Sequence, residues 1–260
     1  ANYNGAHRLK GEKFHEISWQ GGADFDNYYG EHYGNVIWAQ PNHVSDFPVD
    51  YQWYNGLGKK FQSKLFASFR YLYDKFSLRT EIQYRFLDYR ISGTDDNLID
   101  VTQDYLWHFV NPKISLHYYL SQKKLKHSFA LSFSTANREP TRSDIIEAPT
   151  HKKPIPETLY DLEFSYMMHH DRFYVNATLY GMYYKNQLVL TGEINDVGAA
   201  IMDNVENSYR MGAELAVAYN PVKFFIWRIN GNFSRNRILS YVNFVDNWDD
   251  GGQEEEFLGN

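Results

Sequence analysis

The 260-residue sequence contains no cysteine and no long apolar run. Without cysteine, disulfide bonds, thiol chemistry and thiolate metal sites are excluded. A membrane-spanning helix needs about 18 or more consecutive apolar residues, and the sequence has no such stretch. The mean hydropathy of −0.58 is that of a water-soluble chain, but membrane β-barrels give the same value because half of each strand is polar. These absences exclude a helical membrane protein and leave a β-barrel open.

The sequence also lacks the signals of nucleic-acid binding and of common enzyme classes. Its net charge is −6, which gives no basic footprint for a nucleic acid. The motifs G-x-S-x-G and H-E-x-x-H and a glycine-rich phosphate loop are absent. His169 and His170 are adjacent, so their rings point to opposite sides of an extended chain and do not form a metal pair. We therefore expect no catalytic residue, no metal site, no cofactor and no nucleic-acid partner.

The dominant feature that is present is a strict alternation of apolar and polar residues. It recurs in segments of about ten residues, the length of a tilted membrane-spanning strand. A period of two predicts a strand with one apolar and one polar face. The segments are 61–71, 76–86, 112–120, 127–136, 158–168, 173–180, 209–219 and 225–234, with a less regular one at 15–29.

The connections between these segments alternate between tight and long. A soluble antiparallel sandwich would also alternate in polarity, but its strands average only about 5–6 residues. Tight turns at one end and long loops at the other are typical of a membrane β-barrel. We predict tight turns, facing the periplasm, at 8–12, 73–75, 121–126, 169–172 and 220–223. We predict long loops, facing outward, at 41–56, 92–107, 138–157, 190–207 and from 242 on.

Aromatic residues make up 18% of the chain, including 22 tyrosines. Tyrosine and tryptophan favour the membrane–water interface, where the ring is half wet. Many of them flank the predicted turns and loops, as two interfacial belts would require. The long-loop belt is expected to contain Trp38, Trp107, Phe109, Tyr183 and Tyr184.

Several short motifs, in this order and spacing, resemble the barrel region of TonB-dependent outer-membrane receptors. They are 111–116 (NPKISL), 138–141 (REPT), 156–158 (PET), 179–188 (LYGMYYKNQL), 209–215 (YRMGAEL) and 227–234 (WRINGNFS). The stretch 186–198 (NQLVLTGEINDVG) is similar to the branch common in Bacteroidetes.

The resemblance implies an all-β fold, an antiparallel transmembrane β-barrel of about 22 strands, with an N-terminal plug folded inside it. The alternating segments supply about nine strands of such a barrel, and neither a plug nor a TonB box is recognisable. We therefore expect residues 1–260 to be part of a barrel without its plug. The acidic tail, 242–260, is expected to be a flexible extracellular loop.

Two groups of charged residues are candidate functional residues. One group lies on the polar face and is expected to form a structural charge lattice on the lumen wall, with substrate contact as the open alternative: Arg79, Glu81, Arg85, Asp161, Glu163, Arg210, Glu214 and Arg228. The other makes one long loop basic. It is expected to meet an anionic ligand at the mouth, or otherwise to be a solvated loop near lipopolysaccharide: Arg138, Arg142, His151, Lys152 and Lys153.

Taken with the resemblance, these features lead us to expect a bacterial outer-membrane importer of a scarce metal chelate, an iron siderophore complex. The partners implied are the TonB complex, acting through the plug, the metal-chelate ligand, and outer-membrane lipid or lipopolysaccharide. The alternatives are a haem or cobalamin receptor of the same family, a passive porin or barrel enzyme, and a soluble β-rich binding module.

Overall fold

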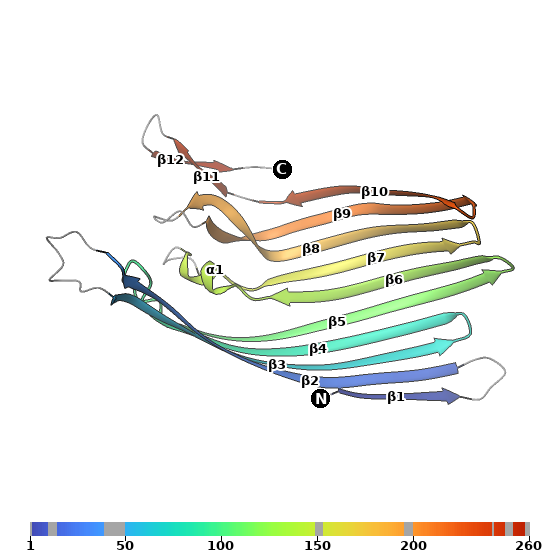
Figure 1. The fold of residues 1–260 in the computed structure, drawn as a ribbon, viewed down its shortest axis with the longest axis horizontal. Helices are drawn as coiled ribbons and strands as arrows, with labels where there is room; N and C mark the ends of the chain where they lie inside the picture. Colours follow the sequence, from blue (N-terminus) through green and yellow to red (C-terminus); the bar gives the residue numbers. More distant parts are fainter. Residues whose placement is uncertain are drawn as a thin grey trace.

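A computed structural model describes residues 2–9, 15–38, 50–148, 153–194, 200–240, 242–247 and 252–257. Its main body is one antiparallel sheet in which each strand pairs with its neighbours along the chain (Figure 1). The strands are β1 (Asn2–Leu9), β2 (His15–Val36), β3 (Tyr51–Tyr73), β4 (Phe76–Gly93), β5 (Gln103–Gln122), β6 (Leu125–Arg138), β7 (Glu157–His169), β8 (Phe173–Ile194), β9 (Ala200–Val222) and β10 (Phe225–Ile238).

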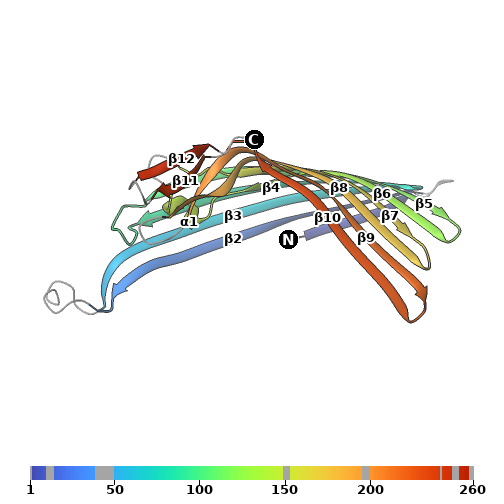
Figure 2. The ribbon, with the colours of Figure 1, turned by 90° about the horizontal axis from the view of Figure 1, so that it is seen from above.

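The sheet is open. The strand order runs from β1 to β10 without a pairing between these two outer strands, and Figure 2 shows a twisted, bent sheet rather than a closed cylinder. The prediction of an antiparallel partial barrel is thus confirmed. The sheet has ten strands instead of about nine, because β1 pairs with the first half of β2. No helix in the described ranges is long and apolar enough to cross a membrane.

Four of the tight turns lie where the sequence predicted them, between β3 and β4, β5 and β6, β7 and β8, and β9 and β10. The fifth, predicted at 8–12, falls largely outside the described residues. Three long loops are shorter than predicted. Figure 1 shows the tight turns together at one end of the sheet. At the other end β3 already begins at Tyr51, β5 begins at Gln103, and β8 and β9 extend the ladder to Ile194 and Ala200. The predicted loops 41–56, 92–107 and 190–207 are therefore wrong in their bounds. Backbone hydrogen bonds join strands whatever their side chains, so the ladder continues beyond the segments that alternate.

One face of the sheet is apolar and is not covered by protein. A row of register partners crosses it from Phe69 on β3 through Thr80, Ile114 and Phe133 to Leu162 on β7, and four of its five members are apolar. The four apolar side chains, in strand order, remain 40%, 47%, 39% and 53% exposed. A contiguous apolar surface of this kind is unfavourable in water and is the lipid-facing band of a membrane barrel. We call this surface the apolar face and the opposite one the polar face.

Aromatic rings form belts near both ends of the apolar face. Near the tight turns, ring centroids are 4.8 Å apart for Phe76–Tyr118, 6.3 Å for Tyr118–Phe129 and 5.0 Å for Phe129–Tyr166. Near the long loops, they are 6.2 Å apart for Phe61–Phe86 and 5.3 Å for Phe86–His108. Belts at both interfaces are expected of a membrane barrel.

Three predicted members of the long-loop belt lie on the polar face instead: Trp107, Phe109 and Tyr184. The reason is that the polarity of the two faces inverts where β4 approaches the long loops. There the polar-face residues are apolar and buried, namely Leu87, Tyr89 and Ile91. Their neighbours on the opposite face are charged, namely Asp88 and Arg90. The period of two persists, but it no longer reports which face meets lipid.

The segment predicted to be a flexible tail contains a two-stranded hairpin, β11 (Val242–Asn247) paired with β12 (Gly252–Phe257). The hairpin lies beside the long-loop end of β8 (Figure 1). The mobility of residues 242–260 stays a prediction.

The two faces differ in their tolerance of charge, and adjacent residues of β7 can test this. We expect Phe164→Arg, on the apolar face, to lower the free energy of unfolding in lipid vesicles by about 2–4 kcal/mol, because lipid does not solvate the charge. Ser165→Arg adds the same side chain on the polar face and should have a much smaller effect. Denaturant titration of the full-length protein in vesicles measures both. Equal losses would contradict the assignment of the faces.

Candidate functional site

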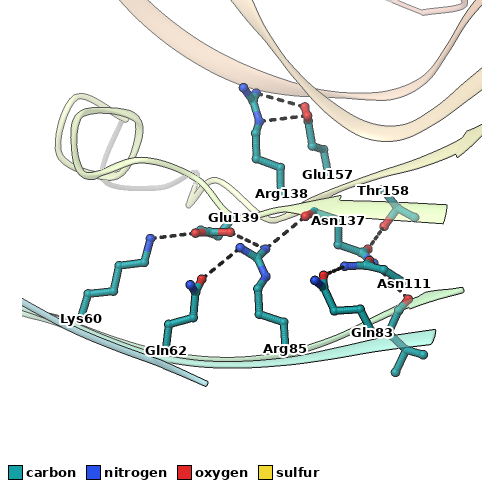
Figure 3. Close-up of polar contacts among 11 residues, drawn as sticks. Lys60, Gln62, Gln83, Arg85, Asn111, Asn137, Arg138, Glu139, Glu157 and Thr158 are labelled. Carbon is teal, nitrogen blue, oxygen red and sulfur yellow. Dashed lines mark hydrogen bonds and ion pairs between the residues drawn. The ribbon is translucent and has the colours of Figure 1, made fainter. Parts of the chain in front are cut away.

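The densest polar cluster lies on the polar face toward the long-loop end, with Arg85 of β4 at its centre. One Nη atom of Arg85 donates to Glu139 at 2.6 Å and to the carbonyl oxygen of Asn137 at 3.1 Å, and the other donates to Gln62 at 3.3 Å. The guanidinium also lies 4.6 Å from the ring centroid of Phe109. Arg85 thereby joins β3 and β4 to the segment that follows β6 (Figure 3).

Glu139, just after β6, accepts from two cations at once. Its second oxygen accepts from Nζ of Lys60 on β3 at 2.7 Å, and its side chain is only 12% exposed. Burial raises the pKa of Glu139, but the hydrogen bond from Lys60 and the charges of Lys60 and Arg85 outweigh it, so the net shift of the pKa is downward. The carboxylate therefore stays ionised and holds the chain against β3 and β4.

A second line of hydrogen bonds crosses β4 to β7. The amide of Asn137 donates to the side-chain oxygen of Asn111 at 2.8 Å, and Asn111 donates to Gln83 at 3.1 Å. Thr158 donates to the side-chain oxygen of Asn137 at 2.7 Å (Figure 3). Each amide thus has a partner on the neighbouring strand, which fixes the strands where β5 and β6 separate.

The segment after Glu139 folds back over the sheet as a short helix, α1 (Arg142–Ile146). Thr141 caps it, because its hydroxyl accepts from the backbone of Asp144 while the Asp144 side chain accepts from the backbone of Thr141. Pro140 is fully buried, and Ile145 packs into the cluster formed by Tyr89, Ile91 and Val101. The predicted loop 138–157 therefore begins with an ordered cover over the apolar patch at the long-loop end.

The basic residues predicted to bind ligand lie in different surroundings. Arg138 makes a two-point ion pair with Glu157, at 2.9 Å and 3.2 Å, apart from the Arg85 cluster (Figure 3). Arg142 points across the polar face to Gly56 of β3. Lys153 is exposed. His151 and Lys152 lie outside the described residues. Ligand binding by this group stays a prediction.

The predicted lumen-wall charges all lie on the polar face, in rows set by the strand register. One row runs from Glu81 through Lys113 and Ser134 to Asp161, and reaches Arg210 beyond Met182. The same register and alternation place the others on this face: Arg79, Arg85, Glu163, Glu214 and Arg228. Among the described ion pairs of this set, Arg85 binds Glu139, whereas Arg210 lies over the ring of Tyr184 at 5.1 Å.

Sequence reasoning missed Glu139, Lys60 and Asn137 as members of the site. A usable signal was present in the motif 138–141, where an acidic residue precedes a proline and a helix cap. Its cationic partners come from strands much earlier in the chain, and only the fold shows that they meet. Within the part of the chain whose side chains are described, no group of three or more histidine and acidic residues could hold a metal ion.

A comparison with protein families finds one that covers nearly the whole chain. The family described as TonB dependent receptor-like, beta-barrel, matches residues 1–258. No curated protein matches the chain significantly.

Several solved structures of similar fold are receptors or transporters of far greater length. The FrpB iron transporter from Neisseria meningitidis matches with a TM-score of 0.58 and 15% identity, over 91% of this chain and 35% of that one. The ferric-catecholate import receptor Fiu from K12 E. coli matches with a TM-score of 0.60 and 12% identity, over 96% and 39%. The ferripyoverdine receptor of Pseudomonas aeruginosa matches with a TM-score of 0.59 and 11% identity, over 98% and 40%.

The chain therefore spans well under half the length of these proteins. At such identities the likeness concerns the fold alone. Together with the family match over residues 1–258, it confirms that the sheet corresponds to part of a receptor barrel, and it leaves the cargo of this chain open.

The ion pairs of Glu139 should matter more for stability than a comparable pair at the surface. We expect Glu139→Gln to lower the free energy of unfolding by about 3 kcal/mol, because it leaves the charges of Arg85 and Lys60 partly buried and unpaired. Asp171→Asn is the matched control. Asp171 and its partner Lys124 are 65% and 74% exposed, so the loss should be about 1 kcal/mol or less. Thermal unfolding of the detergent-solubilised full-length protein compares them, and equal losses would contradict this ranking.

The same pair should make stability depend on pH. The folded-state pKa of Glu139 lies below its ordinary value of 4.5, so its stabilising contribution is complete above the unfolded-state pKa. It is lost as the pH falls through the folded-state pKa. The difference in melting temperature between wild type and Glu139→Gln should be constant above about pH 5.5 and shrink on further acidification. A difference that grows on acidification would contradict the assignment.

Proposed function

Because this chain belongs to the TonB-dependent receptor-like β-barrel family, we propose that it forms part of the wall of an outer-membrane receptor that imports a scarce metal chelate. We further propose that the chelate is an iron siderophore complex and that the TonB complex drives its uptake through a plug inside the barrel. The protein then acts by binding and transport and catalyses no reaction.

The observation that carries this proposal is the two-faced sheet itself. An apolar face with aromatic belts backs onto a face lined with charged and amide side chains, as in a barrel that carries polar material through lipid. The solved proteins that share this fold include an iron transporter, a ferric-catecholate receptor and a ferripyoverdine receptor. Their cargoes motivate the choice of an iron chelate for this chain.

In this proposal the two ends of the sheet have different roles. The tight turns face the periplasm, and the long loops meet the ligand outside the cell. The segment from Arg138 through α1 lies at the long-loop end and is anchored to β3 and β4 by Glu139. A fixed anchor would let this loop present its basic residues to an anionic chelate in one arrangement, which reduces the ordering cost of binding.

Uptake in the bacterium that encodes the protein tests the proposal. A strain lacking the gene should accumulate less radiolabelled iron from at least one ferric siderophore under iron limitation, and a strain lacking TonB should show the same defect. The intact gene should restore uptake in the first strain but not in the second. Normal accumulation from hydroxamate, catecholate and carboxylate siderophores alike in the gene-deleted strain would overturn the choice of cargo.

A further inference from the structure

Arg142 of α1 has no counter-charge among the described residues. Its Nε atom is shielded from solvent and has no hydrogen-bond partner. Its guanidinium lies beside β3, where one Nη atom is 2.9 Å from the position that a Cβ on Gly56 would occupy. The arginine therefore reaches across the polar face from the loop to the sheet. A partly buried cation without a partner is costly, and proteins normally supply an anion to it.

The neighbouring groups are compatible with an anion. Gly56 pairs with His32 of β2, and the charge of Arg142 is close enough to act on both His32 and Tyr89. The Nε2 atom of His32 is likewise shielded and unbonded, and in one tautomer it donates a hydrogen bond. The site thus combines a guanidinium and an imidazole that each have a shielded nitrogen atom without a hydrogen-bond partner among the described residues.

The other cations of this region already have partners. Lys60 and Arg85 bind Glu139, and Arg138 binds Glu157. Arg85 shares with Arg142 an unbonded Nε atom, but its Nη atoms bind a carboxylate. Arg142 differs because the carboxylate of its own helix, Asp144, is used in capping Thr141.

The strands beside Arg142 carry several glycines, and the lack of a side chain at Gly56 leaves room for the guanidinium. His32, Gly56 and Gly93 lie in one register row, and Gly30 pairs with Gly58 in the row beside it. Gly93 has a φ of +99°, which side chains rarely adopt. The ring of Tyr28 lies over Gly30, where an added Cβ would meet its hydroxyl at 2.1 Å. The glycine positions beside Arg142 therefore carry no side chains, and the Tyr28 ring borders them.

From this arrangement we propose that Arg142 and His32 form an anion-binding subsite on the polar face at the long-loop end, which takes an anionic oxygen of the cargo, a phenolate or a carboxylate. The identity of the bound cargo rests on the proposed function, whereas the subsite itself rests on the positions of Arg142 and His32. It lies beside the ordered α1 segment, so its guanidinium is already positioned. Within the proposed receptor it would favour negatively charged chelates over uncharged ones.

Binding of probes to the full-length receptor in detergent tests the subsite. The probes are a triply negative tris-catecholate complex of Fe³⁺, an uncharged tris-hydroxamate complex of Fe³⁺, and inorganic phosphate. Tryptophan fluorescence reports the chelates, and the rise in melting temperature reports phosphate. We expect Arg142→Gln to weaken binding of the tris-catecholate complex about 10- to 100-fold, as for loss of a charge-assisted hydrogen bond. The same substitution should leave the affinity for the uncharged complex unchanged. It should also abolish the rise in melting temperature that phosphate causes.

Two further variants control for charge and for geometry. Arg90→Gln also removes one arginine charge, but on the opposite face of the sheet, where Arg90 of β4 binds Asp88 at 2.9 Å. This variant should bind every probe as the wild type does. Arg142→Lys should retain part of the affinity for the anions. Equal weakening of both chelates by Arg142→Gln, or unchanged binding of all three probes, would overturn the subsite. If phosphate raises the melting temperature of the wild type but not of Arg142→Gln, and the wild type binds neither chelate, the subsite is supported and the proposed iron-chelate cargo is contradicted.

Unfolding without ligand separates the subsite from a structural role. Arg142→Met removes an uncompensated charge and should leave the melting temperature unchanged or higher. Arg85→Met breaks a protein ion pair and should lower it. A fall with Arg142→Met as large as that with Arg85→Met would show that a protein group elsewhere in the receptor pairs with Arg142, and would overturn the proposal.

Discussion

The structure depends on one constraint, which is that lipid offers no hydrogen-bond partner to the backbone. Every N–H and C=O group within the membrane must find a partner in a neighbouring strand. The ten strands satisfy this by pairing strictly in sequence order, with register shifts confined to a few positions such as Gly34/Asn35. Only the outer strands β1 and β10 have an edge without a partner in the sheet. Such edges require a further strand in the membrane, which agrees with a chain that covers part of a longer barrel.

The sequence was sufficient to predict the strands wherever lipid dictates the side chains. Phe76 to Phe86 alternates strictly because one side must be apolar and the other faces polar groups, and the register confirms both faces. Beyond Phe86 lipid no longer selects the side chains. There Tyr89 and Ile91 pack against Ile145 of α1, and the loop bounds inferred from alternation were wrong. Alternation of apolar and polar residues therefore predicts the two faces only where one of them contacts lipid.

The candidate site was only partly predictable, because its contacts join distant parts of the chain. Arg85 was predicted to lie on the polar face, and it does, but its partner Glu139 comes from a loop that sequence reasoning treated as basic and ligand-binding. The same loop contains Arg138, whose charge Glu157 neutralises, and Arg142, whose charge no described residue neutralises. Residue type was identical for these two arginines, and spatial context alone distinguished them.

The two faces also explain how so little identity can accompany so similar a fold. The apolar face needs only apolar side chains at every second position, and many sequences meet that requirement. Identities of 11–15% with solved receptors are therefore compatible with TM-scores near 0.6. In the proposed receptor, selectivity would come from residues that lipid does not constrain, which are those of the polar face and the long loops. Arg142 belongs to this group, because it projects from a loop onto the polar face and its charge has no described structural use.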